Sequence, residues 1–314
     1  MGISQYIKEI GRGKDGARAL SREQAADLFG QVLDGAVTDL EVGAFCIAMR
    51  VKGETPDEMA GFLDATHARL HHVPASALPL IVLPSYNGAR KLPLLTPLLA
   101  FLVARRGLPV LIHGTQTEGS RVFVSHVLEA LDVQPLHAVR AVASHEVAYL
   151  RTETLSPGLK RLLDVRRTVG LRNSAHSIVK LMNPSAGDAV IVGSFTHPEY
   201  AVSMAAAYEL MGSTAMLLRG TEGEPVADPR RMRALIGFER GERIELQAEQ
   251  KGTVAELPEL PADTAPDKTA AYIRDVLSGK LPVPAPIASQ VEHILRLANC
   301  ANDANHIPIR ETTH

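Results

Sequence analysis

The apolar positions in the first seventy residues recur at intervals of three and four, the spacing of one face of a helix. Three helices are predicted, and each begins with a capping box, in which Ser or Thr is followed three residues later by Glu or Gln. The boxes pair Ser21 with Gln24, Thr38 with Glu41, and Thr55 with Glu58. These start signals predict a small helical domain over residues 1–75.

From residue 76 the pattern changes to short apolar runs separated by helical segments. The runs read LPLIVLPS, LPVLIHG, DAVIVGSF and TAMLLRG, and RIELQAEQ further on alternates as an edge strand does. Alternation of such runs with helices indicates a largely parallel sheet covered by helices. We therefore predict an α/β domain with a mainly parallel central sheet over residues 76–314.

The composition changes this picture little. The chain has 314 residues, 46% of them hydrophobic, and a net charge of -2, so any nucleic-acid binding must come from a local basic patch. Cys46 and Cys300 are too few for a disulfide framework, which favours a reducing cytoplasm. No apolar run has the length of a membrane span, so no membrane partner is expected.

The stretch Val82–Pro93 has the strand, small-residue turn and helix that proteins commonly use to hold a phosphate. Its turn reads Pro84, Ser85, Tyr86, Asn87 and Gly88. Proline has no N–H to donate, and the next three residues bring side chains where close backbone approach needs glycine. The turn is therefore interpreted as a former phosphate loop.

Several strings carry a family resemblance. The segment DGAVTDLEVGAFCIAMRVKGETPDEMAGF resembles the N-terminal helical segment of anthranilate phosphoribosyltransferases and of nucleoside phosphorylases with the same fold. The similarity continues through RRGLPVLIHG, VLEALDV, LKRLLDVRRTVGLRNSAHSIVKLMNP and AAAYELMGSTAMLLRG, and covers residues 18–225. It implies a small helical domain, completed by helices within residues 158–183, a larger α/β domain, and a homodimer formed through the small domain.

Four features that bind phosphoribosyl diphosphate and magnesium in that family are altered. The Gly-Thr-Gly-Gly-Asp loop corresponds to Pro84–Gly88, and the following Asn-x-Ser-Thr to Leu94–Pro97. The Lys-His-Gly-Asn-Arg string keeps only His113 and Gly114, and Pro225 and Val226 stand at the metal-binding Asp-Glu pair. Glu222 and Glu224 are the neighbouring carboxylates that a rebuilt metal site could use. The resemblance therefore implies a chain without the family's reaction, with no catalytic residue, metal or cofactor.

The densest basic segment is residues 151–180, with seven Lys or Arg against two acidic residues. Helical spacing predicts a buried face of Leu162, Val165 and Val169, opposite a face that presents Lys160, Arg161, Asp164 and Arg167. Such a charged face is suited to nucleic-acid phosphates, and it is also typical of an ordinary solvated helix surface. The candidate interface residues are Lys160, Arg161, Arg166, Arg167 and Arg172, extended by Arg90 and Lys91 in the rebuilt turn.

The chain also resembles a divergent branch of the family that lacks the catalytic strings and is described as binding nucleic acid as a homodimer. This resemblance implies largely sequence-independent binding of single- or double-stranded DNA, or of RNA. Two alternatives stay open: a phosphoribosyltransferase or pentosyl phosphorylase with a rebuilt diphosphate site, and a small-ligand sensor or scaffold. His113 is expected to be a satisfied, partly buried histidine, and His67, His71 and His72 lack the carboxylates that support a metal site.

Overall fold

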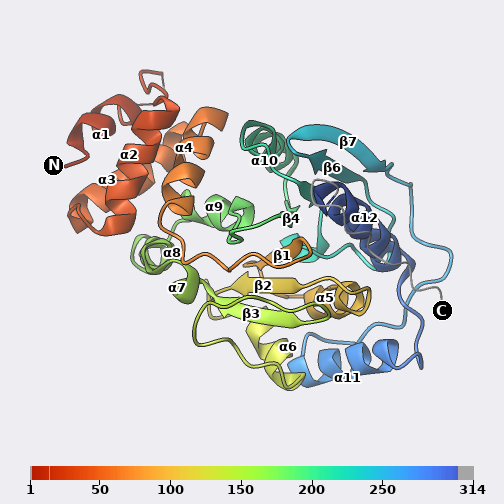
Figure 1. Ribbon diagram of the computed structural model, residues 1–314. Coiled ribbons are helices and arrows are strands. Elements are labelled where there is room, and N and C mark those ends of the chain that lie inside the picture. Colours follow the sequence, from red (N-terminus) through yellow and green to blue (C-terminus); the bar gives the residue numbers. More distant parts are fainter. Residues whose placement is uncertain (1, 14, 303–314) are drawn as a thin grey trace. The chain divides into compact units, whose positions relative to one another are not determined.

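The computed structural model describes residues 2–13 and 15–302, which fold into two compact units (Figure 1). Unit 1 contains residues up to His71 together with Thr152–Pro184, and unit 2 contains His72–Arg151 and the described residues from Ser185 onward. The first segment of unit 1 thus ends four residues before the expected boundary at residue 75. Its completing segment begins at Thr152 rather than at residue 158.

Unit 1 is built from helices alone. These are α1 (Ser4–Ile10), α2 (Arg22–Asp34), α3 (Asp39–Lys52), α4 (Pro56–His67), α7 (Thr152–Leu155), α8 (Pro157–Val169) and α9 (Ala175–Leu181). The three predicted capping boxes are confirmed at the starts of α2, α3 and α4. Pro56 takes the first turn of α4, where a missing N–H costs no hydrogen bond.

The core of unit 1 contains three phenylalanine rings, one from each of α2, α3 and α4. The rings of Phe29 and Phe62 stack with centroids 4.5 Å apart, and Phe45 meets both edge-on. Helices α2 and α4 approach closely because Gly61 has no side chain: a Cβ there would lie 2.2 Å from the carbonyl oxygen of Arg22. The apolar spacing read from the sequence therefore forms one continuous core.

Unit 2 contains one seven-stranded sheet, in the order β3-β2-β1-β4-β5-β6-β7. Its strands are β1 (Leu80–Ser85), β2 (Val110–Gly114), β3 (Val147–Arg151), β4 (Ala189–Ser194), β5 (Ala215–Leu218), β6 (Leu235–Glu239) and β7 (Glu242–Gln247). Strands β1 to β5 are parallel, and β6 and β7 continue the sheet antiparallel. The four predicted apolar runs form β1, β2, β4 and β5, and β7 is the expected edge strand.

Helices cover both faces of this sheet (Figure 1). One face packs against α5 (Thr96–Arg105), α6 (Val124–Ala130), α11 (Pro266–Leu277) and α12 (Ala285–Asn302). On the other face lies α10 (Pro198–Leu210), whose Tyr208 approaches Gly193 so closely that a Cβ there would lie 2.2 Å from the tyrosine oxygen. The predicted α/β class, with a mainly parallel sheet between helices, is confirmed.

The carboxyl ends of the five parallel strands are aligned. Arg151 pairs with Gly114, Gly114 with Ser85, and Ser194 with Leu218, while the register of β1 with β4 places Ser85 level with Ser194. From β1 the chain proceeds outward to β2 and β3, and from β4 it proceeds the other way to β5. Ligands of open α/β sheets bind at such a reversal, and the turn after β1 lies there.

Candidate functional site

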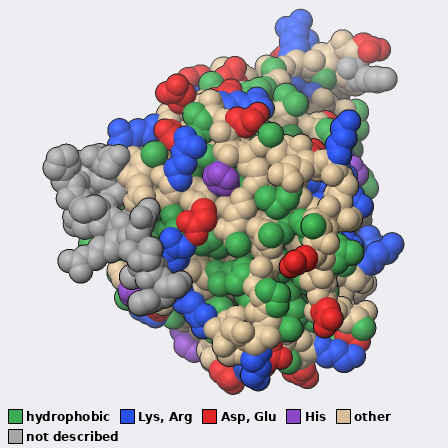
Figure 2. Space-filling view, turned by 90° about the vertical axis from the view of Figure 1, so that its right-hand side faces the viewer, with side chains coloured by type: hydrophobic (Ala, Val, Ile, Leu, Met, Phe, Trp, Pro, Cys, Tyr) green, Lys and Arg blue, Asp and Glu red, His purple; other side chains and the backbone are tan. Residues whose placement is uncertain are grey.

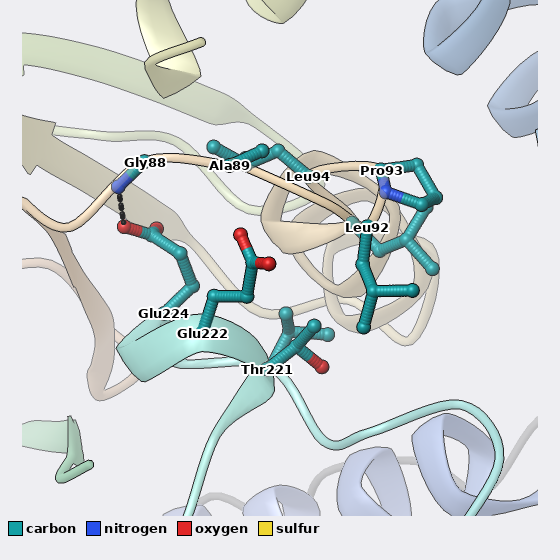
Figure 3. A pocket seen from close by; sticks show the side chains of 10 residues that line it. Gly88, Ala89, Leu92, Pro93, Leu94, Thr221, Glu222 and Glu224 are labelled. Atoms are coloured by element: carbon teal, nitrogen blue, oxygen red, sulfur yellow. Dashed lines mark hydrogen bonds between the residues drawn. The ribbon is translucent and has the colours of Figure 1, made fainter. Parts of the chain in front are cut away.

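The turn after β1 directs four backbone N–H groups toward two carboxylates of this same chain. Figure 3 shows one of these bonds, from Gly88 to Glu224, with Glu222 beside it. Asn87 N and Gly88 N each donate to Glu224 Oε1 at 2.8 Å. Arg90 N and Lys91 N donate to the two carboxylate oxygens of Glu222, at 2.5 and 3.0 Å. Successive N–H groups of this kind form an anion site, and here glutamates occupy it.

Glu224 is held like a bound anion. Its side chain is buried, with the residue 2% exposed, and its second oxygen accepts from the hydroxyls of Ser85 and Thr96. Two of the side chains that stand where close phosphate approach needs glycine bind the glutamate segment instead. Ser85 donates to the Glu224 carboxylate, and Asn87 Nδ2 donates to the carbonyl oxygen of Glu222 at 3.0 Å. Buried carboxylates need such a full set of donors to stay stable in the interior.

The segment that brings in the glutamates, Gly220–Val226, fits its surroundings closely. Gly223 has a positive φ of 84°, and a Cβ there would lie 1.8 Å from Asn87 Nδ2, so only glycine fits. Gln290, fully buried on α12, binds the C-terminal end of this segment. It accepts from Ala227 N at 2.8 Å and donates to the Pro225 carbonyl at 3.0 Å. We call this segment the glutamate plug.

Little space is left beside the plug. The cavity between the turn and the plug has a volume of about 10 Å³ and is lined by Gly88, Leu92, Thr221, Glu222 and Glu224 among others. That volume holds about one water molecule. A diphosphate does not fit unless the plug moves.

His113, at the end of β2, has no acid–base role in this arrangement. Its Nδ1 lies 2.8 Å from the Tyr86 hydroxyl, and complete burial lowers its pKa to about 3, so it is neutral near pH 7. Its Nε2 is buried without a hydrogen-bond partner among the described residues, so the expected histidine is fully rather than partly buried and is satisfied at one of its two ring nitrogens. Tyr86 is itself buried, and Gly114 is required because a Cβ there would lie 2.1 Å from the Ser85 carbonyl.

The basic segment forms α8, and its buried side differs from the prediction. Ser156 caps the helix and Pro157 takes its first turn. Leu159, Leu162 and Leu163 are the buried residues, whereas Val165 and Val169 are half-buried. The buried stripe therefore lies at the N-terminal half of α8, and the C-terminal turn is more open than its apolar spacing predicts.

Three of the predicted interface cations on α8 are engaged by unit 1 itself. Lys160 Nζ pairs with Asp164, and Arg167 Nε lies 3.4 Å from the same carboxylate. Arg161 donates to the Leu33 carbonyl at 2.7 Å, which caps the last turn of α2 with a positive charge. The two ion pairs lie within one helix, whereas the contact of Arg161 with Leu33 joins distant segments that the charge pattern alone did not indicate.

Arg166 and Arg172 are brought together around a histidine. Burial, and after it the charges of Arg172, Arg166 and Lys180, lower the pKa of His176 to about 3. The ring therefore stays neutral, and the positive charge of this cluster comes from the three longer side chains. We call Arg166, Arg172 and Lys180 the basic cluster of unit 1.

Arg90 and Lys91 belong to unit 2. Their side chains are exposed, while their backbone is fixed by Glu222. They therefore project from a held turn at the carboxyl end of the parallel sheet.

Within residues 2–13 and 15–302, no group of three or more His, Cys, Asp or Glu side chains is placed to bind a metal ion. His71 Nδ1 lies 2.8 Å from the Thr154 carbonyl, and His67 Nε2 accepts from Asn183 N at 3.0 Å. None of the helices in these ranges combines the length and apolar character that crossing a bilayer requires.

Comparison with known proteins agrees with this fold. Residues 4–69 match the glycosyl transferase family helical bundle domain. The chain is 30% identical over 289 residues to an anthranilate phosphoribosyltransferase of Desulfosudis oleivorans, covering 88% of this chain and 83% of that protein. The chain belongs to the anthranilate phosphoribosyltransferase family.

Within this family, the uncharacterized protein YbiB of Escherichia coli is 39% identical over 298 residues, covering 93% of this chain and 92% of YbiB. Two solved structures share the fold. Anthranilate phosphoribosyltransferase from Thermus thermophilus has a TM-score of 0.69 at 23% identity, covering 96% of this chain and 88% of that one. The Saccharomyces cerevisiae enzyme in complex with PRPP and Mg has a TM-score of 0.66 at 17% identity, covering 96% and 94%.

The sequence alone missed the role of Glu222 and Glu224. They were considered as carboxylates for a metal, and the structure shows them bound to backbone N–H groups of the turn after β1. The available signal was the spacing of Gly220, Gly223 and the two glutamates, which is typical of a tight loop rather than of a helix or strand.

Proposed function

We propose that this member of the family is not a phosphoribosyltransferase and that it binds nucleic acid without strong sequence preference. The glutamate plug is the observation that supports the absence of phosphoribosyltransferase activity. Four N–H donors that would face a diphosphate are already hydrogen-bonded to carboxylates, and the remaining cavity of about 10 Å³ has room for one water. An incoming phosphate would also meet the two negative charges.

The basic cluster of unit 1 supports the proposed binding of nucleic acid. Arg166, Arg172 and Lys180 gather their charges around one neutral histidine, on a chain whose net charge is -2. Lys and Arg contacts to phosphates supply most sequence-independent affinity for DNA and RNA. Arg167, which is 66% exposed at its side chain, extends this surface along α8.

We propose a homodimer formed through α3 of unit 1. Its residues Leu40, Ile47 and Val51 are 85%, 41% and 63% exposed and recur at intervals of seven and four, so they share one helix face. Beside them, residues of α1 and α3 line an apolar hollow of about 380 Å³. An apolar face of this kind fits a second copy, and Ile47→Asp with Val51→Asp should give monomers in analytical ultracentrifugation.

Two free cysteines, with Cys46 buried and its thiol pKa raised by burial to about 11, suit a reducing compartment. These cysteines support the proposal of a cytoplasmic location.

The deciding experiment is fluorescence anisotropy of a labelled oligonucleotide at about 50 and 200 mM salt, the range that reveals phosphate contacts. Binding that weakens steeply with salt is expected. Absence of binding at the lower salt would remove the nucleic-acid function.

A rival function draws on the named relatives: an enzyme of the same family that uses another pentosyl substrate. It requires the plug to open for a diphosphate. Calorimetry with phosphoribosyl diphosphate and magnesium tests it, and we expect no heat of binding; micromolar affinity would establish the rival.

A further inference from the structure

Half of the described Lys and Arg side chains of unit 2, nine of eighteen, form an ion pair with a carboxylate. Among these pairs are Arg106 with Glu292, Arg274 with Asp132 and Arg296 with Glu239. Figure 2 views the side on which α11 and α12 lie in Figure 1, and there Lys and Arg are interspersed with Asp and Glu. That side offers a polyanion no region of uniform positive charge.

The carboxyl end of the parallel sheet is different. Arg151 ends β3, Arg90 and Lys91 follow β1, and Arg219 follows β5. All four are exposed, and within the described part of the chain none has an Asp or Glu within ion-pair distance. The acidic residues of the neighbouring turns, Glu222 and Glu224, are occupied by backbone N–H groups.

These cations follow the carboxyl ends of three parallel strands, β3, β1 and β5. The register places Arg151, Ser85 and Leu218 level with one another on β3, β1 and β5. Neighbouring strands are about 4.8 Å apart, so the four steps from β3 to β5 span roughly 19 Å. A chain of phosphates that crosses the sheet edge therefore meets a positive charge at each end, and Arg90 and Lys91 add two more in the turn that Glu222 holds.

An exposed aromatic pair follows the carboxyl end of β4. The rings of His197 and Tyr200 are 6.3 Å apart, His197 is exposed, and Tyr200 is 39% exposed at the start of α10. The chain continues from β4 toward this pair beside β5, because Phe195 N donates to the Leu218 carbonyl. Tyr86, the aromatic residue that the sequence placed in the turn, is buried and offers no ring surface.

We propose that the carboxyl edge of the unit 2 sheet binds single-stranded nucleic acid, with phosphates on Arg151, Arg90, Lys91 and Arg219 and one base stacked on Tyr200 and His197. This rests on the proposed function and specifies its ligand. A single strand is favoured because its bases are free to turn toward an aromatic ring, whereas a duplex keeps them stacked inside. Two acidic residues oppose this binding: Glu199, exposed beside Tyr200, and Glu222, half-buried and bound to the backbone of Arg90 and Lys91.

The test compares three double variants of the full-length protein by anisotropy, with a labelled thymidine oligonucleotide and a duplex of equal length. His197→Ala with Tyr200→Ala removes the rings, and Arg151→Gln with Arg219→Gln removes the outer charges. Arg240→Gln with Arg243→Gln is the matched control. These two arginines are also exposed, and they flank the β6–β7 hairpin at the opposite edge of the sheet.

The ring variant should weaken single-strand binding about tenfold with an unchanged salt slope, and leave duplex binding unchanged. The charge variant should weaken both ligands and make the salt slope shallower by about two. The control should bind like the wild type, and Glu199→Gln should bind more tightly. If the wild type binds but both edge variants bind equally well, this edge is not the site, although the proposed function stands; if the wild type does not bind, both fail.

Discussion

The turn after β1 and the basic cluster of unit 1 are two places where this chain has charged groups suited to an anion, and they differ in what already occupies them. At the turn, Glu222 and Glu224 accept four backbone hydrogen bonds and fill the space. In the cluster, Arg166, Arg172 and Lys180 gather around the neutral ring of His176. The anion site of the turn thus holds carboxylates of its own chain, while the cluster consists of cations, the residue type that contacts phosphates in nucleic-acid complexes.

The comparison also separates two effects of replacing a family motif. Loss of the loop glycines alone would leave buried N–H donors unsatisfied, which is costly. The glutamate plug restores those hydrogen bonds from inside the chain. The family fold thus persists without the ligand around which its turn is arranged.

The largest expected effect comes from emptying the turn. Glu224→Ala removes the acceptor of two backbone N–H groups and two hydroxyls, so we expect the free energy of unfolding to fall by about 3 kcal/mol or more. Added formate should raise the melting temperature of this variant more than chloride does at equal ionic strength, because formate can occupy the vacated position.

Glu249→Ala is the matched control for that variant, since Glu249 is half-exposed and pairs with Arg233 at the surface. It should lose less than about 1 kcal/mol and show no formate effect. A Glu224→Ala protein as stable as the wild type would mean that the carboxylate does not hold the turn.

The double variant Arg166→Gln with Arg172→Gln tests whether the basic cluster of unit 1 binds nucleic acid. We expect nucleic-acid affinity at about 50 mM salt to fall roughly tenfold or more and the salt slope to become shallower by about two, since each phosphate contact contributes about one. Lys8→Gln with Arg18→Gln removes two exposed positive charges from the same unit and should have little effect. Equal affinity in both variants would place the interface elsewhere.

The two buried histidines should make both regions sensitive to acid. The pKa values of His113 and His176 are lowered to about 3 in the folded protein, so protons bind preferentially to the unfolded chain. Their stabilising contribution is complete above the unfolded value of about 6.5 and is lost as pH falls toward 3. At pH 5 the loss is about 2 kcal/mol for each histidine.

Urea unfolding at pH 7 and pH 5 measures this loss, and His113→Phe should reduce it by about half. The same pH dependence in the variant as in the wild type would show that His113 titrates normally.

The smallest expected effect concerns Arg161, which the charge pattern assigned to the interface. Because its guanidinium caps the Leu33 carbonyl at the end of α2, Arg161→Gln should cost about 1 kcal/mol of stability. Its nucleic-acid salt slope should stay that of the wild type. A shallower salt slope of nucleic-acid binding at unchanged stability would show that Arg161 contacts phosphate rather than capping α2.

Much of the fold was readable from local pattern. The capping boxes at Ser21, Thr38 and Thr55 start three helices where expected, and the four long apolar runs became strands of the parallel core. Strand β3 was missed: its five residues, VAYLR, end in a cation and lack the continuous apolar run of the other parallel strands. The pairing of Lys160 with Asp164 follows from their spacing of four on one helix, a local relation that sequence supplies.

The sequence by itself determined the two-part architecture, the loss of the glycine-rich loop and the concentration of cations in residues 151–180. Only the tertiary structure decided how each is used. Glu224 meets Asn87 across 137 positions of sequence, and Arg161 meets Leu33 across 128. Helix and strand periodicity arises from neighbours a few residues apart, whereas hydrogen bonds between distant segments form only when packing brings those segments together.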